Sequence, residues 1–583
     1  MRLTVGKGSC GIAAGASEVF DRLAQSMQMP DYCQLTVTGC IGTCYLEPIV
    51  NVEIGSKKHT FIKVTPDVAD EILKLINGEV NQAQKNAIRQ ADLDVLLLQQ
   101  RVALQNCGII DPECIDEYIA CNGYEAIEKC IRELKPEGVI EEIKESGLRG
   151  RGGAGFPTWI KWDAARKAEG STKYIICNAD EGDPGAFMDR SLIEGDPHAV
   201  VEGMMIAAYA INSPGEIIDG VIYARAEYPL AIIRLEKAIA AARERGLLGE
   251  NIFGSGFSFD VRVKAGAGAF ICGEETALIA SLEGERGMPR LRPPYPAQSG
   301  FHKKPTNINN VETYANIPWI IRNGGSAFSA MGTDDSKGTK VFALAGKVVK
   351  GGLVEVQMGK TIRDVVMGVG GGIIGGRALK GVQIGGPSGG CIPEELCDTM
   401  IDYGSLTATG AIMGSGGMVV MDDATCMVDM ARFFLDFTCK ESCGKCPHCR
   451  IGNKRMLETL ERICSGDGRD GDIELLEDLA MQIKDGSLCA LGQTAPTPVL
   501  TTIRYFRDEY EDHIADKKCT ALHCKPLLKY TIISDQCIGC TMCAIECPDD
   551  AITGTFKEPH VVDEEKCTKC GICAEMCHAV LVE

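Results

Sequence analysis

Residues 537–548 read CIGCTMCAIECP, and residues 567–577 read CTKCGICAEMC. Both runs space four cysteines as C-x2-C-x2-C-x3-C, and Pro548 follows the first run. Three cysteines so closely spaced let one loop wrap three faces of an iron–sulfur cubane. The chain cannot turn back tightly enough to supply the fourth ligand from the same loop, so we expect each run to take its fourth ligand from the other.

The spacing is that of bacterial ferredoxins with two [4Fe-4S] clusters. We expect one cluster on Cys537, Cys540, Cys543 and Cys577, and the other on Cys567, Cys570, Cys573 and Cys547. The alternatives are a pair of zinc ribbons or a disulfide knot, and the exact repeat of eight cysteines disfavours both. Such a tail would conduct single electrons.

The composition limits the classes of protein to which the chain can belong. The chain has 583 residues, 29 of them cysteine, and a formal net charge of −20. So acidic a chain is poorly suited to nucleic acid, which is bound through clustered Lys and Arg. The sequence has no secretory signal pattern and no apolar run long enough for a membrane span. We therefore expect a cytoplasmic protein whose thiols stay reduced and whose clustered cysteines bind metal.

A third cysteine group lies in the run ESCGKCPHCR, residues 441–450. Cys443, Cys446 and Cys449 again follow C-x2-C-x2-C, but no fourth cysteine is near. We expect Cys489 to complete a [4Fe-4S] site, because a helical hairpin could return it to the other three. The alternative is a zinc site that uses His448.

Another set of metal-binding residue types lies between the two cluster regions. Three cysteines with one histidine are a normal composition for tetrahedral zinc. Here the set would be Cys464, His513, Cys519 and Cys524, with His523 competing for the place of His513. Such a site could pin the tail to the helical region before it. The alternative is a set of ordinary thiols.

Glycine-rich and acidic loops mark the middle of the chain. Residues 147–157 read GLRGRGGAGFP, which contains G-x-G-x-x-G but follows a helical stretch, so an ordinary Rossmann motif is disfavoured. Glycines there leave backbone N–H groups free to approach a phosphate or a flat ring. Residues 178–185 read NADEGDPG and follow an apolar strand, where carboxylates can meet ligand hydroxyl or N–H groups. A solvated acidic turn is the alternative for this loop.

In the order of its motifs, the chain resembles the NADH-oxidising FMN subunit of respiratory complex I and its soluble relatives. The motifs are GRGGAGFP, NADEGDPGAF, ICGEETAL, PRLRPPYPA, NINNVET and ESCGKCPHCR. The resemblance spans roughly residues 135–500. The additional N-terminal domain and the two-cluster tail are similar to the flavin subunit of electron-bifurcating hydrogenases and related NAD(P)-linked complexes.

The resemblance implies two sets of binding residues. FMN would contact Gly150, Gly152, Lys161, Asn178, Asp180, Glu181, Gly273, Glu274, Asn309 and Asn310. The nicotinamide nucleotide would lie near Phe156, Asp183, Glu275, Arg292 and Tyr295. The chemistry would be carried by FMN, with Lys161 and Glu275 nearby, and Cys443, Cys446, Cys449 and Cys489 match the family's [4Fe-4S] ligands.

Three positions depart from the family pattern. Asp183 stands where Glu is frequent, Phe270 where Tyr is frequent, and Ala164 where an aromatic residue is common. These departures bear on the choice of dinucleotide. Because the carboxylates of Asp183 and Glu275 would repel a 2′-phosphate, we expect NAD(H) rather than NADP(H).

The N-terminal region resembles a thioredoxin-like [2Fe-2S] domain. Cys40 and Cys44 supply a C-x3-C pair, and Cys10 supplies one residue of the second pair. The family's remaining cysteine would stand at position 5, which is valine, and Cys33 is the available substitute. The region therefore holds either a [2Fe-2S] cluster on Cys10, Cys33, Cys40 and Cys44 or a degenerate domain kept for docking.

Together these features predict a multidomain α/β protein. The expected order is a thioredoxin-like domain (1–80), a helical linker (81–135), a Rossmann-like FMN and NAD(H) domain (136–335), a β-grasp-like module of the SLBB type (336–400), a helical-bundle [4Fe-4S] domain (401–515), and a zinc hinge with the two-cluster ferredoxin domain (516–583).

The resemblance implies an NAD(P)H-dependent oxidoreductase subunit that exchanges hydride between NAD(H) and FMN and passes single electrons to its clusters. The implied partners are ferredoxin, a complex I-type [2Fe-2S] subunit, and a terminal catalytic subunit such as a hydrogenase or formate dehydrogenase. Two alternatives stay open: the NADH-oxidising subunit of a non-bifurcating complex, such as an NAD-dependent formate dehydrogenase, and an electron-transfer or assembly subunit without nucleotide turnover.

Overall fold

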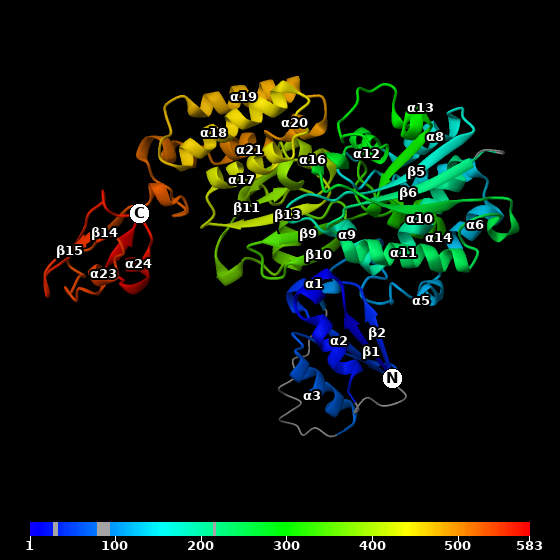
Figure 1. Cartoon of the computed structure of the whole chain (residues 1–583), viewed down its shortest axis with the longest axis horizontal. Coiled ribbons are helices and arrows are strands. Elements are labelled where there is room, and N and C mark those ends of the chain that lie inside the picture. The colour runs from blue at the N-terminus through cyan, green and yellow to red at the C-terminus, as the bar shows by residue number, and fades with distance from the viewer. Residues whose placement is uncertain (27–32, 79–93, 214–216) are drawn as a thin grey trace. The chain divides into compact units, whose positions relative to one another are not determined.

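The computed structural model describes residues 1–26, 33–78, 94–213 and 217–583. The chain divides into two compact units, residues 1–376 with 381–420, and residues 377–380 with 421–583. Figure 1 shows both units, coloured from blue at the N-terminus to red at the C-terminus. Of the expected helical linker over 81–135, the part up to residue 93 lies outside the described residues.

The first unit begins with a small mixed sheet in the order β2-β1-β3-β4. Strand β1 runs parallel to β2 and antiparallel to β3, and β3 runs antiparallel to β4. Alternate residues of β1, such as Leu3 and Val5, are buried against apolar side chains of the flanking helices. The elements are β1 (Arg2–Gly6), α1 (Ser9–Ala13), α2 (Ala16–Ala24), β2 (Gln34–Thr38), β3 (Val50–Ile54), β4 (Lys57–Phe61) and α3 (Pro66–Ile76).

A parallel sheet in the order β7-β6-β5-β8 forms the centre of the first unit. Helix α10 is apolar along almost its whole length and packs against α14, α8 and strand β5. The strands are β5 (Thr172–Ala179), β6 (Ile217–Ala224), β7 (Asp260–Ala265) and β8 (Thr306–Asn310). The helices are α5 (Ile115–Ala120), α6 (Glu125–Glu133), α7 (Pro136–Ser146), α8 (Thr158–Lys167), α9 (Met188–Gly195), α10 (Pro197–Ile211), α11 (Pro229–Glu244), α12 (Glu275–Leu282), α13 (Pro296–Ser299), α14 (Val311–Asn323) and α15 (Gly325–Ser329).

A second sheet has the order β10-β9-β13-β11-β12. Its outer pairs are antiparallel hairpins, whereas β13 runs parallel to β9. This mixed sheet is the small α/β module expected after residue 336. Its elements are β9 (Thr339–Gly346), β10 (Gly352–Gln357), β11 (Leu379–Ile384), β12 (Gly390–Pro393), α16 (Tyr403–Ala408) and β13 (Gly417–Asp422).

The second unit is a helical bundle followed by a small cysteine-rich module. In α18, Met456, Leu460 and Ile463 recur at helical spacing and are buried in the bundle core. The helices are α17 (Met427–Lys440), α18 (Asn453–Cys464), α19 (Asp472–Gly486), α20 (Ala490–Thr494), α21 (Thr497–Tyr505) and α22 (Arg507–Glu511). The final module contains β14 (Tyr530–Ile532), α23 (Met542–Ile545), β15 (Ile552–Thr553), β16 (Val561–Val562), α24 (Ile572–Met576) and β17 (Val580–Val582).

These elements confirm a multidomain α/β chain with a helical region and a compact tail. In the final module, β14 pairs with β17 and β15 with β16, both antiparallel, so the two cysteine repeats are tied together by their flanking strands. No helix among the described residues is long and apolar enough to cross a membrane.

Candidate functional site

The carboxyl edge of the parallel sheet brings two asparagines together. The register pairs Cys177 with Asn309 and Asn178 with Asn310, so the ends of β5 and β8 lie side by side. The carboxyl edge is where open α/β sheets bind ligands, because the loops there diverge and leave room for one. The loops that follow β5 and β8 therefore lie next to each other at the carboxyl edge of the sheet.

Asn178 organises the loop that follows β5. Its side-chain amide donates to the Gly273 carbonyl at 2.8 Å, and its side-chain oxygen accepts from the Asp180 backbone N–H at 3.1 Å. Asp180 itself is only 6% exposed. These contacts join the NADEGDPG loop to the ICGEETAL segment, which is distant in the sequence.

A chain of three charged side chains crosses the same region. Lys161 on α8 is paired with Glu275 at the start of α12. The second oxygen of Glu275 lies 3.9 Å from the Arg292 guanidinium. All three side chains are partly exposed, at 22%, 28% and 42%, so they can meet a ligand without leaving the protein surface.

The glycine-rich loop lies against this edge. The Gly150 N–H donates to the Phe156 carbonyl at 2.8 Å, which closes the loop on itself. A Cβ at Gly152 would stand 2.9 Å from the Cβ of Asn310, so only glycine permits this approach. The buried Tyr403 hydroxyl donates to the Gly150 carbonyl at 2.9 Å and holds the loop in place.

Several expected contact residues use their polar atoms within the protein. The Glu181 carboxylate accepts from the backbone N–H groups of Asp189 and Arg190, and the Glu274 carboxylate caps α12. The Asn309 side-chain oxygen accepts from Trp162, and Asn310 contacts Asp189 and caps α14. These four residues shape the site through their neighbours.

Asp183 lies on the loop that follows β5. Ser415 donates to its carboxylate at 2.6 Å, and burial raises the pKa of Asp183 to about 6. The aromatic residues expected near the nucleotide are open to solvent, with Phe156 50% and Tyr295 54% exposed. Flat exposed rings of this kind are suited to stacking on another ring.

The third cysteine group lies where the helical bundle turns. Cys449 is buried and receives contacts from Ser442 at 3.2 Å and Asn453 at 3.6 Å. The Leu488 backbone N–H donates to the Cys446 sulfur at 3.4 Å, so the segment that carries Cys489 does return to the other three cysteines. The ring of His448 packs on Gly486.

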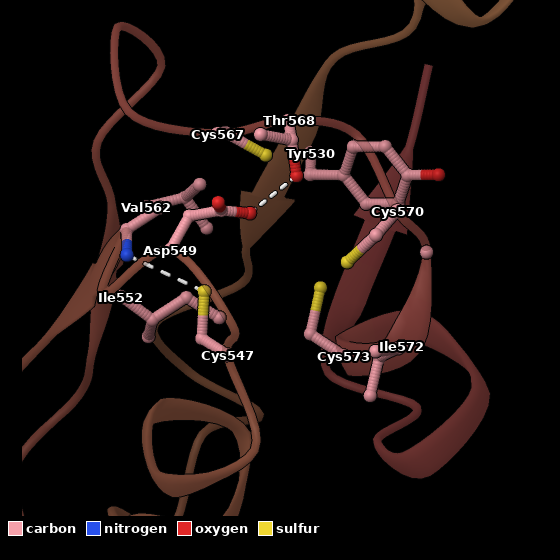
Figure 2. Close-up of a pocket in the computed structure, with 12 residues that line it drawn as sticks. Tyr530, Cys547, Asp549, Ile552, Val562, Cys567, Thr568, Cys570, Ile572 and Cys573 are labelled. Atoms are coloured by element: carbon pink, nitrogen blue, oxygen red, sulfur yellow. Dashed lines mark hydrogen bonds between the residues drawn. The ribbon is translucent and has the colours of Figure 1, made fainter.

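The tail gathers its eight cysteines into two cavities. Cys547, Cys567, Cys570 and Cys573 line one cavity, and Figure 2 shows their sulfur atoms facing a shared space. Cys537, Cys540, Cys543 and Cys577 line the other. The grouping is the crosswise one, in which each repeat lends its last cysteine to the other.

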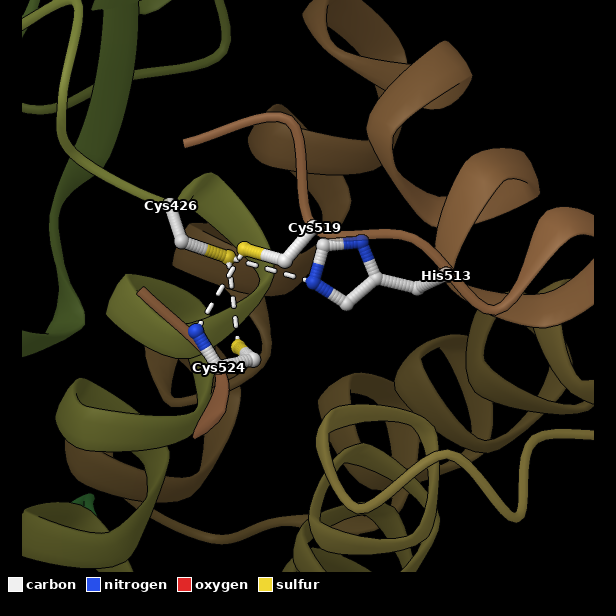
Figure 3. Close-up of side chains that lie close together, drawn as sticks. All are labelled: Cys426, His513, Cys519 and Cys524. Carbon is white, nitrogen blue, oxygen red and sulfur yellow. Dashed lines mark hydrogen bonds between the residues drawn. The ribbon is translucent and has the colours of Figure 1, made fainter. Parts of the chain in front are cut away.

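A compact group of sulfur and nitrogen ligands lies in the second unit. The ligand atoms of Cys426, His513, Cys519 and Cys524 all lie within 4.8 Å of one another, and the four side chains are buried (Figure 3). The Cys426 sulfur is 3.4 Å from His513 Nε2 and 3.7 Å from the Cys524 sulfur. His513 Nδ1 is 2.7 Å from the Glu509 carbonyl, which orients the ring.

This group differs from the expected zinc set in one ligand. Cys426 takes the place assigned to Cys464, which lies beside Cys524 but outside the four-residue group. His523 is also excluded, because its ring points to Asp429 at 3.0 Å and is 57% exposed. Cys426 precedes α17 and lies 87 residues from His513, so no local spacing in the sequence links the two.

The N-terminal cysteines gather only in part. The sulfur atoms of Cys10, Cys40 and Cys44 lie within 4.8 Å of one another. Cys33, the expected fourth ligand, instead packs against the apolar core of this region. The structure therefore brings together three of the four residues in the expected [2Fe-2S] set.

Comparisons with known proteins agree with this layout. Residues 143–319 match the Nuo51 FMN-binding domain, and residues 429–513 match the NADH-ubiquinone oxidoreductase-F iron–sulfur binding region. Residues 530–553 match a 4Fe-4S binding domain. The chain is 58% identical over 462 residues to the NADP-reducing hydrogenase subunit HndC of Solidesulfovibrio fructosivorans, covering 79% of this chain and 93% of that one.

The chain belongs to the family of FMN-binding F subunits of NADH oxidoreductases. It is also 46% identical to an F subunit of NADH-quinone oxidoreductase of Rhizobium meliloti, over 72% of this chain and 98% of the relative. Among solved structures, it matches the NAD+-reducing [NiFe]-hydrogenase in the H2-reduced state with a TM-score of 0.62 and 30% identity, covering 88% of this chain and 84% of that one. The chain is thus an oxidoreductase of the FMN and iron–sulfur type.

The residues at the sheet edge fit the flavin that defines the family. Asn178 places an amide at the end of β5, Asp180 offers a buried carboxylate, and Lys161 offers a cation for a phosphate. At Gly150 and Gly153 an added Cβ would meet no atom closer than 3.5 Å, so the loop leaves an open backbone surface. The cavities lined by four cysteines likewise fit iron–sulfur clusters.

Proposed function

We propose that this member of the family exchanges hydride between NAD(H) and FMN and passes single electrons to three [4Fe-4S] clusters. The observation that carries the proposal is the convergence of the Lys161–Glu275–Arg292 charges with Asn178 and Asp180 at one sheet edge. Glu275 and Arg292 come from two separate sequence motifs, and Lys161 lies on α8, which follows the glycine loop of a third. Such convergence is hard to explain for a chain that binds no flavin.

When bound, FMN supplies the conversion between a two-electron hydride and single electrons, which no side chain can perform. The chain's residues bind, orient and shield it. Lys161 would neutralise phosphate charge, Asp180 would accept a hydrogen bond from a ring or ribosyl group, and the backbone of residues 150–153 would approach the cofactor closely. Glu181, Glu274, Asn309 and Asn310 would hold the surrounding loops and helix ends in place.

The nucleotide would use the exposed side of the same region. Phe156 and Tyr295 offer rings for stacking, and Glu275 and Arg292 offer an acceptor and a donor for ribose and phosphate groups. We propose NAD(H) as the physiological nucleotide, because Asp183 and Glu275 place negative charge near it. The ion pairs of Glu275 with Lys161 and Arg292 weaken the repulsion between its carboxylate and a 2′-phosphate. The expected preference for NAD(H) therefore depends mainly on Asp183.

Electrons would leave through the cysteine-bound clusters. Cys443, Cys446, Cys449 and Cys489 would bind the first, and the two crosswise quartets of the tail would bind the others. A zinc ion on Cys426, His513, Cys519 and Cys524 would tie the start of the tail to α17.

For the domains, we propose a thioredoxin-like N-terminal domain, a Rossmann-like flavin domain, an SLBB-type β-grasp module, a helical [4Fe-4S] domain and a ferredoxin-like tail. The boundaries are those expected from the sequence, except that β13 extends the SLBB-type module to residue 422. The support is the β2-β1-β3-β4 sheet, the four-stranded parallel sheet and the five-stranded mixed sheet.

For partners, we propose ferredoxin, a complex I-type [2Fe-2S] subunit and a terminal catalytic subunit, in a complex that is electron-bifurcating or of the transhydrogenase type. The support is the similarity to HndC, whose name makes it a hydrogenase subunit, and to the NAD+-reducing hydrogenase. An NAD-dependent formate dehydrogenase would use the same flavin chemistry with another terminal subunit. A cytoplasmic location stays a prediction.

The competing function is an electron-transfer or assembly subunit that does not turn over nucleotide. Flavin content and NADH-driven dye reduction of the purified chain distinguish the two. The proposed function predicts about one FMN per chain and dye reduction that falls about a hundredfold when Lys161 is replaced. A chain that holds its clusters but neither binds FMN nor reduces the dye would support the assembly role.

A further inference from the structure

The N-terminal region contains a partly buried three-thiol site that differs from the other cysteine groups. Cys10 comes from α1, Cys40 follows β2, and Cys44 begins a short 3-10 helix, yet their sulfur atoms lie within 4.8 Å of one another. The Cys40 and Cys44 sulfur atoms are 3.6 Å apart. In the part of the chain that the structure describes, only one other group is equally tight, the one that contains His513.

The spacing of these sulfur atoms suits one metal ion. A tetrahedral zinc ion with Zn–S bonds of about 2.3 Å holds its sulfur ligands about 3.8 Å apart. The Cys40–Cys44 distance agrees with that value, as does the Cys426–Cys524 distance of 3.7 Å at the His513 site. The sulfur atoms of the four cysteines that line each tail cavity do not form a group of this tightness.

A [2Fe-2S] cluster does not fit these residues. Such a cluster binds one cysteine pair at each end of an Fe2S2 rhomb, so sulfur atoms bound to different irons lie farther apart than the 4.8 Å within which all three sulfur atoms lie here. The fourth thiol is also missing, because Val5 is buried in the apolar core and Cys33 packs against that core. The three thiols that remain form a single cluster of ligands.

A buried carboxylate stands beside the three thiols. Glu47 is 3% exposed, and its Oε1 lies 3.9 Å from the Cys10 sulfur. Its Oε2 accepts from the Ile49 backbone N–H at 2.9 Å. An added Cβ on Gly6 or Gly11 would stand 3.2 Å from this carboxylate, so the backbone of both glycines packs closely against it.

Among the described residues Glu47 forms no ion pair within 4.0 Å, and the charge of Lys63 acts on its carboxylate from farther away. A buried carboxylate requires a counter-charge, and a metal ion provides one. Carboxylate oxygen is an accepted zinc ligand alongside cysteine. The three sulfur atoms supply three of the four positions of a tetrahedral zinc site, and the Glu47 carboxylate lies beside one of them, Cys10.

We propose that Cys10, Cys40 and Cys44 bind a single divalent metal ion, of which Zn2+ is the best fit, beside the Glu47 carboxylate and in place of a [2Fe-2S] cluster. The ion closes the loop between β2 and β3 onto α1. Because Zn2+ has no redox chemistry, the N-terminal domain takes no part in electron transfer. This inference does not depend on the flavin site, since the metal content can be measured with NADH chemistry absent.

The test is the metal content of the full chain, purified without oxygen from zinc-replete cells. We expect two zinc ions per chain in the wild type and one in Cys40→Ser, with the same iron content in both. Cys33→Ser is the matched control from the same domain and should keep both zinc ions. After dithionite reduction, no [2Fe-2S] signal should appear in EPR spectra at liquid-nitrogen temperature, where [4Fe-4S] signals are too broad to see.

The wild-type measurements remain decisive if Cys40→Ser fails to fold. A [2Fe-2S] signal in the reduced wild type would overturn the proposal, as would the loss of two iron atoms, or of no metal, from folded Cys40→Ser. For Glu47, we expect Glu47→Gln to release zinc to a chelator about tenfold faster than the wild type, whereas Glu53→Gln on the exposed end of β3 should release it at the wild-type rate. Equal rates in all three would remove Glu47 from the site.

Discussion

Lys161 and Glu275 form an ion pair although they lie 114 residues apart in the sequence. The pair joins the helix that follows the glycine loop to the first turn of α12. It is partly exposed and faces the edge of the parallel sheet where flavin is proposed to bind. Because an exposed ion pair contributes little to stability, a role in the proposed flavin site accounts best for this pair.

Replacing Lys161 tests the proposed flavin site. Lys161→Ala should lower kcat/KM for NADH-driven dye reduction by about a hundredfold, because one preorganised charge is lost next to the reacting groups. The control is Lys167→Ala on the same helix, whose side chain is 73% exposed and pairs with Asp163. It should keep wild-type activity and flavin content. Equal activity in both variants would place Lys161 outside the site.

The raised pKa of Asp183 predicts a pH-dependent choice of nucleotide. Since the pKa of this carboxyl is about 6, the group is negative above that pH and neutral below it. Repulsion of a 2′-phosphate should therefore weaken as the pH falls, and the preference for NADH over NADPH should fall with it. The measurement is the ratio of kcat/KM values for the two nucleotides from pH 5 to pH 8.

Asp183→Asn provides the necessary control, because a phosphate monoester also loses a proton near pH 6. The variant keeps the phosphate titration and lacks the carboxyl, so its ratio should change less with pH than the wild-type ratio. Identical pH profiles for both proteins would show that Asp183 does not read the 2′-phosphate.

Crosswise ligation of the tail can be tested by iron counts. Cys537→Ala with Cys577→Ala removes two ligands of one expected cluster, so the double variant should lose about four iron atoms. Cys537→Ala with Cys547→Ala damages both clusters and should lose about eight. Ligation within each repeat predicts the reverse, with eight lost from the first pair and four from the second.

The identity of the zinc ligands in the second unit is tested by two single substitutions. Cys426→Ser should lose one zinc ion and lower the melting temperature, since structural zinc contributes directly to folding. Cys464→Ser should keep its zinc, because Cys464 lies outside the four-residue group. Loss of zinc from Cys464→Ser with retention in Cys426→Ser would restore the ligand set expected from the sequence.

Local spacing predicted most of the cysteine chemistry. Cys537 to Cys547 and Cys567 to Cys577 lie in short loops, so their geometry is contained in a few residues. The order of the flavin motifs likewise predicted the family, which is confirmed. The α/β layering followed from apolar strands alternating with helical stretches such as 229–245, which the structure has as α11 (Pro229–Glu244).

Contacts between residues far apart in the chain could not be predicted from the sequence. Cys426 joins His513 only because α17 packs against the later helices of the bundle, and nothing near Cys426 signals this. Cys10 fitted the family pattern and Cys33 was only the available substitute, and the structure packs Cys33 against the apolar core. The sequence predicted ligand contacts for Glu181 and Glu274 but not the backbone N–H groups that their carboxylates also accept from.

The central claim is that NADH reduces flavin bound to this chain and that the electrons then reach its clusters. The direct measurement is anaerobic stopped-flow mixing of NADH with the FMN- and cluster-loaded protein, followed at flavin and cluster wavelengths. We predict flavin bleaching first and loss of cluster absorbance after it, with both absent in Lys161→Ala at the same NADH concentration. A wild-type protein that holds FMN but shows no bleaching at saturating NADH would contradict the account.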